Sequence, residues 1–198
     1  MLKSSALLTS IVLSTTGVLG HVPQPVSQLS PETPIAQTQS NSNSYSPLAQ
    51  RINIPPPEEV SYELYSNSRY HFSVLYPNNI LVPLPPPTNN DGREFISPNE
   101  SIEMVAFGAH NSLDQTLEGM YNEALNAENL DVTYQRLEEN WFIVSGYQGD
   151  TVVYTKVIFD ERENVTDILT LDIRYDKALQ PEFDRVVAEI SNSFTSYQ

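Results

Sequence analysis

The sequence predicts a single α+β domain in which an antiparallel β-sheet is covered by helices on its faces. Strand-like runs outnumber helical ones and follow the order two strands, two strands, helix, four strands, helix. Short turns separate most of the runs, which favours hairpins and antiparallel pairing. The segment WFIVSGYQGDTVVYTKVIF, residues 141–159, is apolar at both alternating sets of positions. Strands that are covered on both faces have this pattern.

The first runs predict two hairpins and an edge segment. SYELYS (61–66) and RYHFSVLYP (69–77) are rich in Tyr, Phe and Val and flank a turn at Asn67–Ser68. The following stretch carries Pro83 and Pro85–Pro87, which confine it to a sheet edge or a crossing loop. REFISP (93–98) and SIEMVAFGA (101–109) then predict a short and a longer strand separated by Pro98–Asn99.

A helix is expected to begin at Ser112, because Gln115 stands three residues later as in a capping box. Its apolar positions form one stripe, which consists of Leu113, Leu117, Met120, Tyr121, Ala124 and Leu125. Four strand-like runs follow at 130–139, 141–147, 151–160 and 165–176, with hairpin turns expected at 148–150 and 160–164. The last helix opens with Pro181, and its apolar face consists of Phe183, Val186, Val187, Ile190 and Phe194.

The first 59 residues predict a secreted protein with a tether. Lys3 precedes an apolar run from Ser5 to Gly20, which is typical of a cleavable signal peptide over residues 1–20. A membrane anchor is the alternative, but the run is shorter than the roughly 20 residues that span a bilayer. We therefore expect no stable membrane insertion after cleavage, and a periplasmic, thylakoid-lumenal or secreted location. Residues 21–59 are rich in Pro, Ser, Gln and Asn and predict a disordered tether, either a spacer or an arm that orders on a partner.

Composition excludes several function classes for the packed domain, residues 60–198. The chain has no cysteine, so disulfides, thiolate nucleophiles and thiolate metal sites are excluded. It has 10 basic and 25 acidic residues and a net charge of −15. This charge repels phosphate backbones, so we expect no nucleic-acid partner.

The packed domain resembles the PsbP-like family, which includes extrinsic lumenal proteins of photosystem II and the Mog-type Ran-binding proteins. The resemblance is carried by YHFSVLYP, DGREFISPNESIEMVAFG, VTYQRLEENWFIVSGY, VVYTKV and the closing helix FDRVVAEISNSF. It implies an α/β/α sandwich and an accessory role through binding, with no catalytic or metal residues to carry over. It also implies photosystem II as a possible partner. The acidic domain and an N-terminal arm without basic or hydrophobic anchors argue against that partner.

Two pairs of residues suggest catalysis, and neither has the surroundings that catalysis needs. Ser145 and Lys156 could form a serine–lysine pair for acyl transfer. Ser145, however, lies in mid-strand without a glycine-rich loop or a nearby histidine. We expect it to pack against a helix, with Lys156 extending to the rim of the sheet. The Glu138–Glu139 pair is adjacent on a strand and points to opposite faces, which excludes a glycosidase pair. We expect no catalytic residues and no enzymatic activity.

Ligand sites are weaker alternatives. Carboxylates gather around one turn and are candidate calcium ligands, although Arg162 lies among them: Asp160, Glu161, Glu163 and Asp167. His71 and His110 could meet a carboxylate at a zinc site, but no spacing motif requires it. Six tyrosines on expected strands could stack on sugars, namely Tyr65, Tyr76, Tyr134, Tyr147, Tyr154 and Tyr175. Core and rim packing is the default explanation for tyrosines on strands.

The sequence thus predicts a secreted, non-enzymatic accessory protein that binds a protein partner and has no cofactor. A small calcium- or glycan-binding module is the alternative, and a hydrolase is a second one.

Overall fold

The computed structural model describes residues 52–163 and 165–197. Within them, a seven-stranded antiparallel sheet has the order β3–β4–β5–β9–β8–β7–β6. The strands are β3 (Val82–Pro83), β4 (Gly92–Ile96), β5 (Ile102–His110), β6 (Asp131–Leu137), β7 (Trp141–Gln148), β8 (Thr151–Arg162) and β9 (Val165–Asp176). A small three-stranded sheet consists of β1 (Tyr62–Asn67), β2 (Phe72–Pro77) and β10 (Thr195–Ser196).

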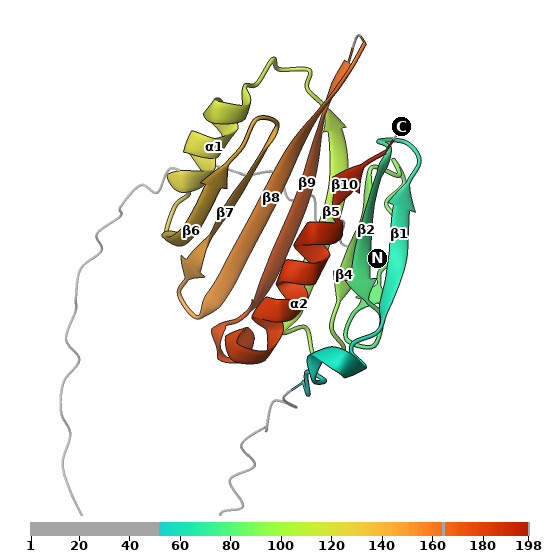
Figure 1. The fold of residues 1–198 in the computed structure, drawn as a ribbon, viewed down its shortest axis with the longest axis vertical. Coiled ribbons are helices and arrows are strands. Elements are labelled where there is room, and N and C mark those ends of the chain that lie inside the picture. The colour runs from blue at the N-terminus through green and yellow to red at the C-terminus, as the bar shows by residue number, and fades with distance from the viewer. Residues whose placement is uncertain (1–51, 164, 198) are drawn as a thin grey trace, which may run out of the picture. The chain divides into compact units, whose positions relative to one another are not determined.

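Helices cover the two faces of the large sheet (Figure 1). The helix α2 (Gln180–Ser193) and the small sheet pack on one face, over the larger hydrophobic core. The helix α1 (Leu117–Leu125) packs on the other face, over a smaller core that includes Phe142, Val144 and Val157. Two short 3-10 helices, η1 (Pro57–Glu59) and η2 (Lys177–Leu179), complete the elements of the described residues. The predicted α+β class and the antiparallel sheet between helices are confirmed.

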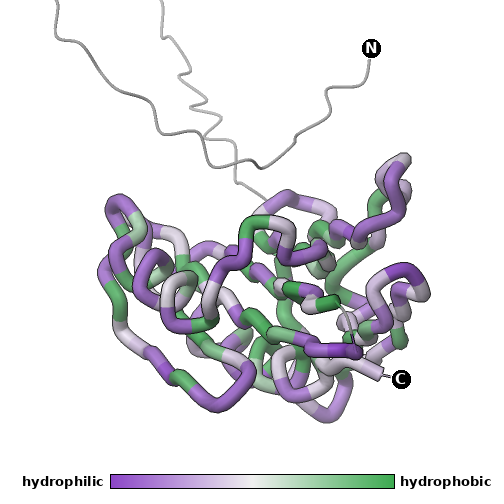
Figure 2. The backbone as a smooth tube through the Cα atoms, turned by 90° about the horizontal axis from the view of Figure 1, so that it is seen from above, coloured by the Kyte–Doolittle hydropathy of each residue, from purple (hydrophilic) through white to green (hydrophobic). Residues whose placement is uncertain are grey.

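The apolar segment 141–159 forms the hairpin β7–β8, which has a helix on each face. Cross-strand pairing places Ile143 opposite Lys156 and Ser145 opposite Tyr154 on the side of α2. The pair Phe142–Val157 belongs to the core beneath α1. Figure 2 shows hydrophobic segments between the layers and hydrophilic segments along the outer loops. Both alternating sets are apolar because each set packs against a different helix.

The first helix begins at Leu117, so the predicted start at Ser112 is wrong. The side chain of Thr116 caps the helix and accepts a hydrogen bond from Gly119 N at 3.1 Å. Asp114 has a φ of 51°, which interrupts any helix that starts earlier. Leu113 therefore lies outside the helical stripe and is 80% exposed.

Packing begins N-terminal to the predicted boundary at residue 60. Ile52 and Ile54 contact the larger core, so the final residues of the predicted tether are part of the packed domain. The predicted signal peptide and most of the tether, residues 1–51, lie outside the described residues. In the described part of the chain, the helices are too short and too polar to cross a membrane.

Candidate functional site

A groove of about 530 Å³ lies between α2 and the β6–β7–β8 part of the large sheet. Its floor includes Ile143, Ser145 and Val152 from the β7–β8 hairpin. One wall is α2, and β6 forms the opposite rim with Tyr134 and Arg136. The residues that line the wall are Gln180, Asp184, Val187, Ala188, Ser191 and Asn192. The groove forms because α2 covers only the central strands and leaves the hairpin side of the same face open (Figure 1).

Ser145 and Lys156 both line this groove, and their polar atoms bind backbone carbonyls. Ser145 Oγ donates to Val153 O at 2.8 Å. Lys156 Nζ donates to Ser191 O at 2.7 Å and to Phe194 O at 3.3 Å, at the end of α2. The expected extension of Lys156 to the rim of the sheet is therefore wrong, because the ammonium group caps the helix instead. Burial lowers the pKa of Lys156.

Two phenols of the groove, the buried Tyr175 and the half-buried Tyr154, are hydrogen-bonded to α2. Tyr175 donates to Asp184 Oδ1 at 2.5 Å, and Tyr154 Oη lies 2.6 Å from Ser191 Oγ. Burial, and then the hydrogen bond to Asp184, raises the pKa of Tyr175 far above its usual value. Burial also raises the pKa of Tyr154. Both phenols are thus kept neutral and serve as hydrogen-bond partners.

Trp141, the only tryptophan of the chain, lies at the groove between two cations. The guanidinium carbon of Arg136 is 5.0 Å from the centre of its ring, and Lys156 Nζ is 5.4 Å from it. These distances are within the range of cation–π contacts. Tyr134 on the rim is 48% exposed. The groove therefore combines aromatic rings with polar side chains, and its β6 side carries Arg136.

The structure separates the six tyrosines that were considered for sugar stacking. Tyr134, Tyr154 and Tyr175 line the groove. Tyr147 donates to the side chain of Gln180 at 3.1 Å. The remaining two belong to the larger core at the β1–β2 side, where Tyr65 and Tyr76 both contact the ring of Phe95.

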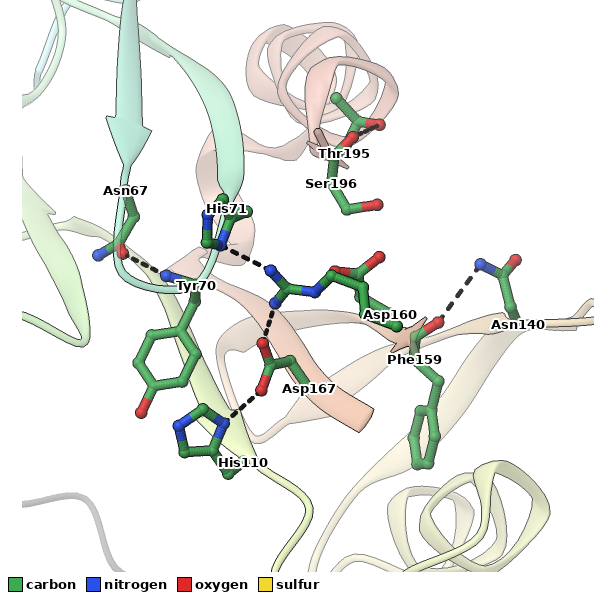
Figure 3. Close-up of polar contacts among 11 residues, drawn as sticks. Asn67, Tyr70, His71, His110, Asn140, Phe159, Asp160, Asp167, Thr195 and Ser196 are labelled. Carbon is green, nitrogen blue, oxygen red and sulfur yellow. Dashed lines mark hydrogen bonds and ion pairs between the residues drawn. The ribbon is translucent and has the colours of Figure 1, made fainter. Parts of the chain in front are cut away.

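A second site surrounds the side chain of Asp167, where three segments meet (Figure 3). This side chain is only 1% exposed. His110 Nδ1 lies 2.5 Å from Asp167 Oδ1, and Arg162 forms an ion pair with Oδ2. Arg162 also donates to His71 Nδ1 at 2.7 Å. Because a guanidinium group only donates, His71 Nδ1 accepts this bond and carries no proton. Nε of Arg162 lies 3.1 Å from Asp160 Oδ2 without the alignment of a hydrogen bond.

Arg162 occupies the position between carboxylates that a cation would take. Asp160 and Asp167, two of the calcium candidates, both face this guanidinium group, while Glu161 and Glu163 are exposed. Across residues 52–163 and 165–197, no three His, Asp or Glu side chains are arranged to hold a metal ion. Both histidines belong to the cluster around this carboxylate: His110 contacts Asp167 directly, and His71 is connected to it through Arg162, whose role the sequence pattern did not reveal.

The comparisons with known proteins support the predicted fold. No family model and no curated protein sequence matches the chain. The solution structure of cyanobacterial PsbP (CyanoP) from Synechocystis sp. PCC 6803 is similar with a TM-score of 0.51. It shares 11% sequence identity, and the match covers 70% of this chain and 94% of that chain.

The fold is PsbP-like.

Two further structures are similar at lower scores. The Ran-binding protein Mog1p of Saccharomyces cerevisiae has a TM-score of 0.46 at 8% identity, over 69% of this chain and 96% of that chain. LpqN of Mycobacterium tuberculosis, involved in cell envelope biogenesis, has 0.39 at 13% identity, over 74% and 83%. A shared PsbP-like fold at such identities carries no function with it, so function has to come from the groove and the Asp167 cluster.

Proposed function

We propose that this protein is a non-catalytic binding protein that acts outside the cytoplasm and holds a protein partner in the groove beside α2. One observation carries the proposal: an open, aromatic groove of about 530 Å³ lies on a face whose neighbouring parts are fully packed. Concave apolar surfaces with a few polar groups are typical binding sites.

Binding is favoured over catalysis by the engagement of the reactive groups in the groove. Lys156 Nζ and Ser145 Oγ donate to backbone carbonyls. A serine nucleophile requires a base within hydrogen-bond reach, and the partner of this hydroxyl is a carbonyl. Tyr175 is tied to Asp184 in the same way. These contacts stabilise the groove and leave its surface for recognition.

A polypeptide is favoured over calcium or a glycan as the ligand. Arg162 pairs with the two carboxylates that calcium would need to share. A sugar would have to stack on Trp141, whose ring is already approached by Arg136 and Lys156. Aromatic residues and arginine are enriched at protein interfaces. The signal peptide predicted at residues 1–20 supports a location outside the cytoplasm.

Affinity capture from the native compartment tests the proposal with two matched variants. Ala188→Phe fills the groove, and Ala127→Phe places the same side chain at an exposed turn after α1. We expect a partner to be captured by the wild type and by Ala127→Phe, and to be lost with Ala188→Phe. Equal capture by all three proteins, or turnover of a substrate that Ala188→Phe abolishes, would reject the proposal. Urea unfolding of both variants checks that they remain folded.

A further inference from the structure

We infer that the bound segment of the partner is an amphipathic α-helix that lies alongside α2 on the open part of the sheet. The inference rests on the proposed function, since it names the structure and chemistry of what fills the same groove. Four features carry it: the length of the groove, the surface of its wall, the chemistry of its floor and the separation of its charges.

The groove has the length and the wall that a second helix needs. Its lining follows α2 from Gln180 to Asn192, which corresponds to about 18 Å or roughly three helical turns. Neighbouring helices pack with their axes about 8–10 Å apart, and small side chains allow the closest approach. Ala188 is exposed near the middle of this wall. A helix of about three turns therefore fits beside α2.

The floor offers apolar contacts to one face of such a helix. Ile143, Val152 and Val187 are largely buried beneath the groove, and the rings of Tyr134 and Tyr154 also line it. Helices that bind in grooves insert apolar side chains at positions i, i+3 or i+4, and i+7. Such a stripe spans about 10 Å, which is shorter than the wall. The groove can therefore receive apolar anchors from one helix face.

Opposite charges stand at the two ends of the groove. Asp184 lies in the N-terminal half of α2, and Arg136 lies over the ring of Trp141. Lys156, which shares that ring, binds the carbonyl of Ser191 in the last turn of α2. Asp184 and Ser191 are separated by about two turns, or roughly 10 Å. The partner helix should thus carry a basic residue opposite Asp184 and an acidic residue opposite Arg136, about seven positions apart.

The remaining exposed face of the partner helix should be basic. From residue 52, where packing begins, to its end, the packed domain has 8 of the 10 basic residues and 24 of the 25 acidic residues, because only Lys3, Arg51 and Glu32 precede it. Its net charge is therefore −16, which attracts cationic partners and accelerates their encounter.

An extended strand that adds to the free edge of β6 fits less well. β6 pairs only with β7, but its register shifts between Val132 and Tyr134. It also carries Arg136 and Glu138, which bind each other with 2.6 Å between Nη2 and Oε1. Bulges and charged side chains are features that protect an edge from pairing. The open face of the sheet is thus a better site than its edge.

The fluorescence of Trp141, the only tryptophan, provides a direct test with tryptophan-free synthetic peptides. The probe is a capped, basic peptide of about sixteen residues with leucines at positions i, i+3 and i+7. It also carries a lysine placed to face Asp184 and a glutamate placed to face Arg136. A peptide of the same composition with two central prolines cannot form the helix. We expect saturable change in emission with the helical peptide, a loss with the proline peptide and with Ala188→Phe, and no loss with Ala127→Phe.

A charge-reversal variant distinguishes specific binding of a helix from nonspecific binding of an apolar peptide. Arg136→Glu should weaken binding of the helical peptide by about three- to tenfold, the effect of a rim charge. A peptide with lysine in place of the matching glutamate should restore binding to this variant. Equal binding of the proline peptide would indicate an extended strand and overturn the inference. If no peptide binds but Ala188→Phe still abolishes capture of the native partner, the inference of a bound helix is overturned and the proposed binding function stands.

Discussion

Lys156 provides the clearest quantitative prediction, because its ammonium group connects the floor of the groove to the end of α2. We expect Lys156→Met to reduce the free energy of unfolding by about 1–2 kcal/mol. Two hydrogen bonds are lost, of 2.7 Å to Ser191 O and 3.3 Å to Phe194 O. A hydrogen bond that involves a charged group contributes about 1.5–3 kcal/mol, and the longer contact contributes less. The favourable interaction of a cation with the helix C-terminus adds about 0.3–1 kcal/mol.

Two effects reduce the sum to the stated range. The lowered pKa of Lys156 reports that burial disfavours its charge, and methionine removes this cost. Methionine also keeps most of the apolar stem of the lysine side chain. Partial solvent exposure screens what remains.

Urea unfolding measures this prediction, with Arg185→Met as the matched control. Arg185 is an exposed cation on the same helix, and its loss should change stability by less than about 0.5 kcal/mol. For a domain of this size, the change at Lys156 corresponds to a fall in Tm of about 2–8 °C. Since the folded state holds the proton of Lys156 less tightly, the wild type should gain stability relative to Lys156→Met as pH rises toward about 10.4. Equal stability of both methionine variants would refute the role of Lys156 as a helix cap.

Three further predictions concern the core and the second site. Asp167→Asn should destabilise the fold by about 2–4 kcal/mol, because Arg162 loses its buried counter-ion. Chemical denaturation tests this value, and an unchanged free energy of unfolding would contradict the role of the cluster. Trp141→Ala should lower the free energy of unfolding by about 2–3 kcal/mol, which is less than the 3–5 kcal/mol of a fully buried aromatic because this ring is partly exposed. Ser145→Ala should lower it by under about 1.5 kcal/mol, because one hydrogen bond is lost. Thermal unfolding tests both values, and the reverse order would contradict the packing. Because the pKa of Tyr175 is raised in the folded state, its stabilising contribution is complete below about pH 10 and declines above that pH. Tyr175→Phe should therefore lose less stability than the wild type as pH rises, which unfolding between pH 9 and 12 measures. The same pH dependence in both proteins would exclude Tyr175 as its source.

The strands were predictable because their patterns are local. β1–β2 and β7–β8 pair as predicted, but the first turn spans residues 68–71 instead of Asn67–Ser68, and the second spans residues 149–150. The start of α1 was not predictable from Ser112 and Gln115. Asn111 Oδ1 accepts from Gln115 N at 2.8 Å, so this loop uses a side chain of its own to satisfy the amide that a capping box would use.

The groove was not predictable, because it depends on which part of the sheet α2 leaves uncovered. The pattern at Ser145 predicted packing against a helix, but the side chain lies on the floor of the open groove, and the pattern at Lys156 could not show that the ammonium group reaches Ser191 O. The arrangement of the second site was also not predictable. The sequence offers a meeting of His71 and His110 with a carboxylate only as an alternative, and it shows Arg162 only as a basic residue among the candidate calcium ligands. Their connection through Asp167 joins three segments that are far apart in sequence.

Photo-crosslinking in the native organism tests the binding role of the groove most directly. A photoreactive amino acid at position 134 stands on the exposed rim of the groove, and the same group at position 113 stands on an exposed loop before α1. The account predicts one discrete crosslinked partner from position 134 and none from position 113. Crosslinks from position 113 alone, or identical products from both positions, would contradict it.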